Sequence, residues 1–219
     1  MASVDPATIV EITLRTLAVC GPALGIAALI GIPLGIALGT RRFAGRGLVV
    51  TTVNAGMGAP PVVVGLWAAT LLWRSGPLGG LELMYTQTAM ILAQVLIAIP
   101  LIIGITFAAV GALDAEWSLQ VETLGIPRRW RLWLLIREIR MGLLAALIAA
   151  LGGILSEVGA VQMVGGNIVG ETRVLTTAIM MHTSMGEFEI AHGLGVVLIG
   201  LTLVVAGLLT AVQQSGRVR

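Results

Sequence analysis

Residues 113–140 read LDAEWSLQVETLGIPRRWRLWLLIREIR, and this polar stretch interrupts a chain that is otherwise strongly hydrophobic. It holds five of the 13 arginines and four of the 11 acidic residues of a 219-residue chain. Long apolar segments flank it on both sides. We therefore expect this cytoplasmic insert, as residues 113–140 are called below, to contact something soluble.

The composition outside the insert is typical of a protein whose main solvent is lipid. Hydrophobic residues make up 57% of the chain and charged residues 11%, against about 25% charged in soluble domains. The mean hydropathy is +1.01. A bilayer core of ~30 Å needs about 20 apolar residues per helix. The sequence therefore predicts an all-α, polytopic membrane protein with one transmembrane domain over residues 1–219 and about five spans, at residues 16–39, 48–73, 90–110, 141–164 and 190–212.

The arginines predict how the chain is oriented. All 13 basic residues are arginine, and ten of them follow the first, third or fifth predicted span. Arg15, Arg74 and Arg173 fall on the opposite side. Because basic residues concentrate on the cytoplasmic side of membrane proteins, the N-terminus is predicted outside and the C-terminus inside. The net charge of +2 is then a signal of topology and gives little support to nucleic-acid binding.

Glycines and prolines mark two features of the first two spans. Gly31, Gly35 and Gly39 recur at four-residue spacing, which allows close approach of another helix, in the chain or in a dimer. Pro60 and Pro61 interrupt the second span, because proline lacks a backbone donor and disfavours helix before it. This break is either a simple kink or a hinge that lines a translocation path.

The cytoplasmic insert itself predicts a helix, a sharp turn and a second helix. Asp114 suits the N-cap of a helix that runs to Leu124, and Gly125 suits the position just past a helix C-terminus. Pro127 suits the first turn of the next helix. The apolar and arginine-rich surface around the turn fits either a groove in a soluble partner or the surface of anionic lipid.

Several motifs carry a resemblance to a known family. The turn TLGI at residues 123–126, followed by basic and aromatic residues, resembles the EAA loop of ABC-importer permeases. Five further motifs resemble the branch of that family that transports tungstate or molybdate: NAGMGAPPVVVG at 54–65, RSGPLG at 74–79, SEVGAV at 156–161, GGNI at 165–168 and ETR at 171–173. A sixth motif, TSMGEFE at 183–189, is most similar to tungstate permeases.

The resemblance implies the ABC type I importer permease fold and a multi-pass location in a prokaryotic cell membrane, in contact with membrane lipid. It implies a homodimer with two cytoplasmic ABC ATPases, which would bind ATP and magnesium, and an extracytoplasmic oxyanion-binding protein. In that family a short coupling helix of the loop docks into the ATPase. The resemblance assigns this contact to Thr123, Leu124, Gly125, Ile126, Pro127, Arg128 and Arg129.

The chain is not expected to be an enzyme or to hold a cofactor of its own. The phosphate-binding loop of ATPases requires a lysine, and the sequence contains none. His182 and His192 lack neighbouring ligands and are interpreted as ordinary loop residues, without a metal. An ion channel or a secondary carrier without an ATPase remains the alternative, although it leaves the cytoplasmic insert without a role. An intramembrane enzyme would need a second catalytic group to pair with Glu157, and Glu157 stands alone in the spans.

Two sets of polar residues are candidates for the translocation path or its gate, beside Pro60 and Pro61. A charged Glu157 within the fourth span would cost about 2.5–3.5 kcal/mol; we expect it to be structural or gating, either protonated or paired with a hydroxyl or with an arginine across the dimer. Arginine suits tetrahedral oxyanions, so a second set is predicted at the outer end: Asn167, Thr172, Arg173, Thr176 and Thr177. Alternatively, Arg173 pairs with Glu171, Glu187 or acids of a docking protein.

Overall fold

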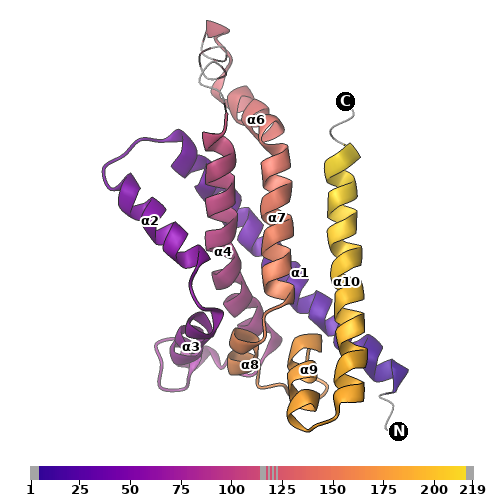
Figure 1. The fold of residues 1–219 in the computed structure, drawn as a ribbon. Coiled ribbons are helices and arrows are strands. Elements are labelled where there is room, and N and C mark those ends of the chain that lie inside the picture. The colour runs from indigo at the N-terminus through magenta and orange to yellow at the C-terminus, as the bar shows by residue number, and fades with distance from the viewer. Residues whose placement is uncertain (1–4, 114–116, 118, 120, 122, 216–219) are drawn as a thin grey trace.

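The computed structural model describes residues 5–215 except 114–116, 118, 120 and 122, and its described part is helical (Figure 1). The long helices are α1 (Pro6–Thr40), α4 (Gln87–Gly111) and α10 (Phe188–Ser215). Shorter elements join them, namely α2 (Arg46–Met57), α3 (Pro61–Leu72), the 3-10 turn η1 (Gly79–Leu81), α6 (Arg128–Glu138), α7 (Arg140–Leu155), α8 (Gly159–Gly165) and α9 (Leu175–Ser184).

The helices are long and apolar enough for three to five membrane crossings. Alone, α1, α4 and α10 have the length and hydropathy of a span, and the bent pairs α2–α3 and α7–α8 bring the total to as many as five. The prediction of about five spans is confirmed at that level. The first helix begins ten residues earlier than predicted, because Asp5 caps it by accepting a hydrogen bond from Ala7 N at 3.2 Å.

The glycine row of α1 packs against α4, the central helix of the fold (Figure 1). A Cβ added at Gly35 would lie 2.6 Å from the Thr106 Cβ and 2.9 Å from the carbonyl oxygen of Ile103. Such distances leave no room for a side chain. The predicted close approach therefore occurs within the chain, in the pairs Gly31 with Ile102, Gly35 with Thr106 and Gly39 with Val110.

The second span is broken where the prolines predict it. Helix α2 ends at Met57, Pro60 is the N-cap of α3, and the two helix axes differ by 102°. Proline is accepted in the first turn of a helix because that amide has no partner there. The bend is much sharper than a simple kink.

The fourth span, predicted over 141–164, is also broken, which the sequence pattern did not predict. Helix α7 ends at Leu155, α8 begins at Gly159, and the axes differ by 59°. The apolar composition continues through the break and hides it. The short helices after both breaks pack together, with Gly159 facing Val62 and Gly65 facing Ala160.

The remaining elements close the outer end of the bundle. Helix α9 is short, and its first residues are buried. Helix α10 packs on α7 and α9 but leaves most of its apolar surface uncovered. The N-terminal end of α1 lies at the same end of the bundle as α8 and α9, while the far end of α10 lies near the level of α6 (Figure 1). This arrangement places the two ends of the described chain on opposite sides of the bundle.

Candidate functional site

The turn predicted at the cytoplasmic end forms as expected around Gly125. We call residues 123–129 the coupling turn. Gly125 has φ +60°, the left-handed conformation that favours glycine. Before it, the Thr123 hydroxyl donates to the Leu119 carbonyl at 2.8 Å. Pro127 is the N-cap of α6 and not a residue of its first turn, one position earlier than predicted. The predicted N-cap Asp114 lies outside the described residues.

The coupling turn has an exposed apolar residue at its tip and is hydrogen-bonded to α6. Leu124 is 73% exposed. Arg131 Nε donates to the Ile126 carbonyl at 2.9 Å and so ties the turn to α6. Arg129 is exposed, and the side chain of Arg128 lies outside the described part of the structure. An exposed leucine on a turn that is hydrogen-bonded to α6 is suited to contact a protein groove, the role that the resemblance implies.

Helices α6 and α7 connect the coupling turn to the interior of the bundle. Ile139 is the C-cap of α6 and also the N-cap of α7, so a single residue separates the two helices. Leu135 and Ile139 are buried with Ile36 of α1 and Val110 of α4 in one apolar cluster. This packing connects the coupling turn to α7 and to the break at its end.

Glu157 lies in that break and caps the helix that follows. Its Oε1 accepts a hydrogen bond from Ala160 N at 2.8 Å, and the side chain is 9% exposed. The carboxyl group thus has a backbone amide of its own chain as partner, which was not among the predicted partners. The Glu157 carbonyl accepts from the Thr176 hydroxyl at 3.1 Å, which links the break to α9.

Gln94 supports the same break from α4, and sequence reasoning missed it. Its Nε2 donates to the Ile154 carbonyl at 3.2 Å and contacts the Sγ of Cys20 at 3.6 Å. The side chain is only 3% exposed. Carbonyls near a broken helix end lack regular partners, so an amide donor from a neighbouring helix stabilises them. A lone glutamine in an apolar span was the available signal.

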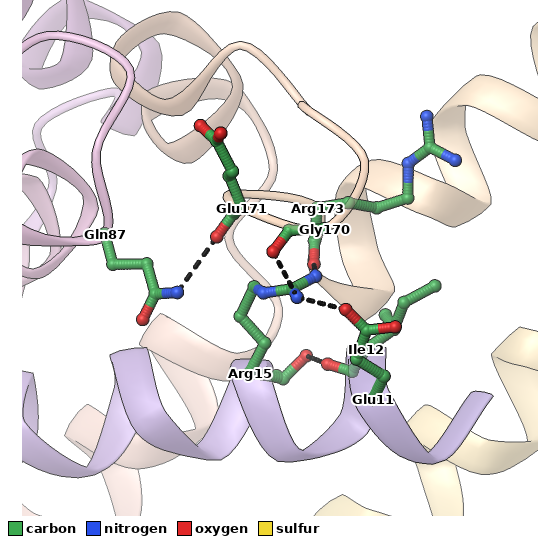
Figure 2. Close-up of polar contacts among 8 residues, drawn as sticks. Glu11, Ile12, Arg15, Gln87, Gly170, Glu171 and Arg173 are labelled. Atoms are coloured by element: carbon green, nitrogen blue, oxygen red, sulfur yellow. Dashed lines mark hydrogen bonds and ion pairs between the residues drawn. The ribbon is translucent and has the colours of Figure 1, made fainter. Parts of the chain in front are cut away.

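At the outer end, Arg15 fastens α1 to residues 166–174, which we call the outer loop. Figure 2 shows its guanidinium directed at the loop backbone. Nη1 donates to the Arg173 carbonyl at 3.2 Å and Nη2 to the Gly170 carbonyl at 2.8 Å, while Nη2 also pairs with Glu11 at 2.5 Å. The side chain is 9% exposed. Sequence reasoning used Arg15 as a topology marker and missed this structural role.

The Arg173 side chain points away from the Arg15 contacts (Figure 2). Its Nε donates to Asn167 Oδ1 at 3.2 Å, and no acidic side chain among the described residues pairs with it. The predicted alternative of an ion pair with Glu171 or Glu187 is therefore not what forms: Glu187 contacts His182 Nδ1 at 2.6 Å instead. Two predicted site residues, Asn167 and Arg173, are thus brought together.

The three threonines of the predicted oxyanion site are buried and engaged by backbone groups. Thr172 Oγ1 bonds Gly165 O at 2.5 Å, Thr176 bonds the carbonyl at the α7–α8 break, and Thr177 bonds Val174 O at 3.1 Å. Their exposed fractions are 1–5%. In this structure they shape the outer loop, and their role toward an anion stays a prediction. Pro60 is exposed and Pro61 half-buried beside the first break.

Comparisons with known proteins show the family to which this architecture belongs. Residues 31–217 match the family described as the binding-protein-dependent transport system inner membrane component. The chain belongs to this family of ABC importer permeases. A probable anion ABC transporter permease of Haloferax volcanii is 40% identical over 89% of this chain and 86% of its own. The tungstate uptake system permease TupB of Peptoclostridium acidaminophilum is 38% identical over 98% of this chain and 93% of its own.

A solved structure supports the fold of this permease. A chain of the MetNI methionine ABC transporter, in an inward-facing conformation, superposes with a TM-score of 0.75 and covers 98% of this chain and 99% of that chain. At 17% identity this likeness shows the fold alone, and it confirms the predicted ABC importer permease fold. The permease is a multi-pass inner membrane component and not an enzyme; in such transporters the ATPase partner binds ATP.

Proposed function

We propose that this permease imports an oxyanion, with tungstate as the first candidate and molybdate as the second. The observation that carries the proposal is the similarity to TupB, which extends over nearly the whole length of both chains. The anion permease of Haloferax volcanii supports the same class of cargo. At the outer end, the guanidinium of Arg173 supplies a planar donor group suited to a tetrahedral oxyanion.

The proposed transporter is a homodimer of this chain with two cytoplasmic ATPases and an extracytoplasmic oxyanion-binding protein. The exposed apolar residues of α3 and α10 are what a second copy and lipid would cover; on α10 they include Val196, Ile199 and Leu203. The coupling turn would dock into the ATPase through Leu124 and its neighbours. Arg173 and Asn167 would meet the anion after the binding protein releases it.

The two broken spans give this transporter a mechanical path from the cytoplasm to the outer loop. Closure of the ATPases would move the coupling turn, and α6 and α7 would carry that movement to Glu157. From there, the short helix α8 packs on α3 beyond the Pro60–Pro61 break, and Thr176 links the break to α9. The Pro60–Pro61 and Glu157 breaks are therefore the proposed hinges of alternating access.

Uptake into proteoliposomes tests the proposal. The full-length permease is reconstituted with its ATPase and its binding protein, and tungstate, molybdate and sulfate inside the vesicles are measured by elemental mass spectrometry. We expect tungstate uptake that requires ATP and is inhibited by vanadate. Uptake that proceeds without ATP would favour a channel or carrier and overturn the proposal.

A matched pair of variants tests Arg173 as an anion contact separately from the import function. Arg173→Gln removes the charge beside Asn167, whereas Arg74→Gln removes an exposed arginine elsewhere on the outer side. We expect the first to lower tungstate uptake at least tenfold, since charge-assisted hydrogen bonds contribute about 1.5–3 kcal/mol, and the second to change it little. Equal uptake by both variants would reject Arg173 as an anion contact and leave the importer itself intact.

A further inference from the structure

A groove of about 790 Å³ opens between the last turns of α1 and helix α6, beside the coupling turn. One wall is formed by α1 through Ile32 and Ala37, a second by α6 through Leu132 and Ile136, and Trp117 and Val121 also line the groove. The α1 wall belongs to a helix long and apolar enough to span the membrane. Lipid chains therefore have access to at least one side of the groove.

Arginines gather at the described mouth of the groove. Arg41, Arg129 and Arg131 line it, and no acidic residue belongs to its described lining. Arg41 and Arg129 are both exposed. Arg131 is engaged by the Ile126 carbonyl through its Nε, so Arg41 and Arg129 are the arginines considered for an anionic head. Apolar walls that lead to a rim of arginines match a molecule with a hydrocarbon tail and an anionic head.

The position of the groove along the membrane normal also matches the boundary between the bilayer and the cytoplasm. Arg41 is the C-cap of α1, so it marks the end of that hydrophobic helix. On α6, Trp130 and Trp133 are 51% and 50% exposed and contact each other edge to face. Tryptophan is enriched at membrane interfaces, where its ring sits at the headgroup level. Helix α6 therefore has the composition of an interfacial helix, with the groove on its inner side.

We propose that this groove binds one anionic phospholipid of the cytoplasmic leaflet. An acyl chain lies along Ile32 and Leu132, and the phosphate lies between Arg41 and Arg129. The volume falls within the ~300–1,000 Å³ of ordinary ligand pockets. Because the lipid touches both α1 and α6, it stiffens the base of the coupling turn. The inference depends on the position of the groove at the membrane surface and not on the identity of the transported anion.

Native mass spectrometry of the purified full-length chain tests the site with phosphatidylglycerol and phosphatidylcholine as probes. We expect bound phosphatidylglycerol to resist removal, and phosphatidylcholine to be lost. Basic residues near an anionic surface contribute about fivefold each to affinity, so Arg41→Gln with Arg129→Gln should weaken phosphatidylglycerol binding by roughly 25-fold. Arg42→Gln is the matched control, because Arg42 is exposed beside Arg41 but does not line the groove.

A second variant tests the apolar part of the site. Ala37→Phe fills the groove without changing its charge, and we expect it to lower phosphatidylglycerol binding while the protein keeps its thermal stability.

Three results would overturn the site. If Arg42→Gln weakened phosphatidylglycerol binding as much as the Arg41→Gln, Arg129→Gln double variant, the effect would come from general surface charge. Competition by inorganic phosphate alone would assign the arginines to a free anion. Loss of the lipid whenever the ATPase is bound would assign the groove to that protein; either result rejects the proposal.

Discussion

Replacing Gly35 by alanine tests the contact between α1 and α4 that organises the bundle. The added Cβ would lie 2.6 Å from the Thr106 Cβ and 2.9 Å from the Ile103 carbonyl oxygen. Neither atom is the end of a flexible side chain, so the two helices must separate. Gly25→Ala is the matched control, because a Cβ at Gly25 meets nothing within 4 Å and lies on the same helix.

Comparing the two variants isolates the loss of stability that the steric clash at Gly35 causes. Both replacements gain the same intrinsic helix propensity of up to about 1 kcal/mol, which cancels in the difference between them. Overpacking of a tight contact costs about 1–3 kcal/mol. At about 2–4 °C per kcal/mol for a protein of this size, a 2 kcal/mol difference lowers the Tm of Gly35→Ala by about 4–8 °C relative to Gly25→Ala.

Thermal unfolding of the two full-length variants in the same detergent, followed by circular dichroism, provides the measurement. Equal Tm values would show that α1 and α4 do not approach closely at Gly35, and the steric reasoning would fail. A lower Tm for Gly25→Ala would also refute it, and would indicate that the exposed face of α1 meets another copy of the chain.

Three further substitutions test the polar contacts and the turn. Glu157→Ala leaves the amide of Ala160 without its partner and should destabilise the permease by about 1–3 kcal/mol, whereas Glu157→Gln keeps an acceptor oxygen and should leave the Tm within about 2 °C; a Gln variant as unstable as the Ala variant would show that the charge itself is required. Gly125→Val places a β-branched residue at φ +60°, which costs about 1–2 kcal/mol, and should lower ATPase co-purification without loss of the membrane fold; unchanged co-purification would reject the turn as the docking element. Arg15→Gln removes the donors to the Gly170 carbonyl and should increase amide hydrogen exchange in the outer loop but not in α4; equal exchange in wild type and variant would contradict the fastening role.

Sequence patterns predicted the features that depend on local chemistry. Pro60 and Pro61 fixed the first break because proline removes a donor wherever it occurs, and Gly125 fixed the turn because its left-handed conformation excludes most side chains. The spacing of Gly31, Gly35 and Gly39 predicted a helix contact. It did not distinguish a contact within the chain from one in a dimer, since the partner helix lies about 70 residues away in sequence.

Features that depend on distant partners were not predictable in the same way. The break at Glu157 lies in an apolar run, and what defines it is the capping bond to Ala160 together with donors from Gln94 and Thr176. Arg15 bonds carbonyls more than 150 residues away. The threonines near Arg173 looked like free donors in sequence, because nothing local showed that backbone carbonyls accept from them.

Accessibility of the coupling turn is the most direct test of the proposed mechanism. Leu124→Cys is introduced together with Cys20→Ala, since Cys20 is the one cysteine of the sequence. The labelling of residue 124 by a membrane-impermeant maleimide is then measured in inside-out vesicles. We predict labelling when the permease is produced alone and protection when its ATPase is produced with it. Equal labelling in the assembled transporter, or no labelling in either sample, would contradict a turn that is open to the cytoplasm and held by the ATPase.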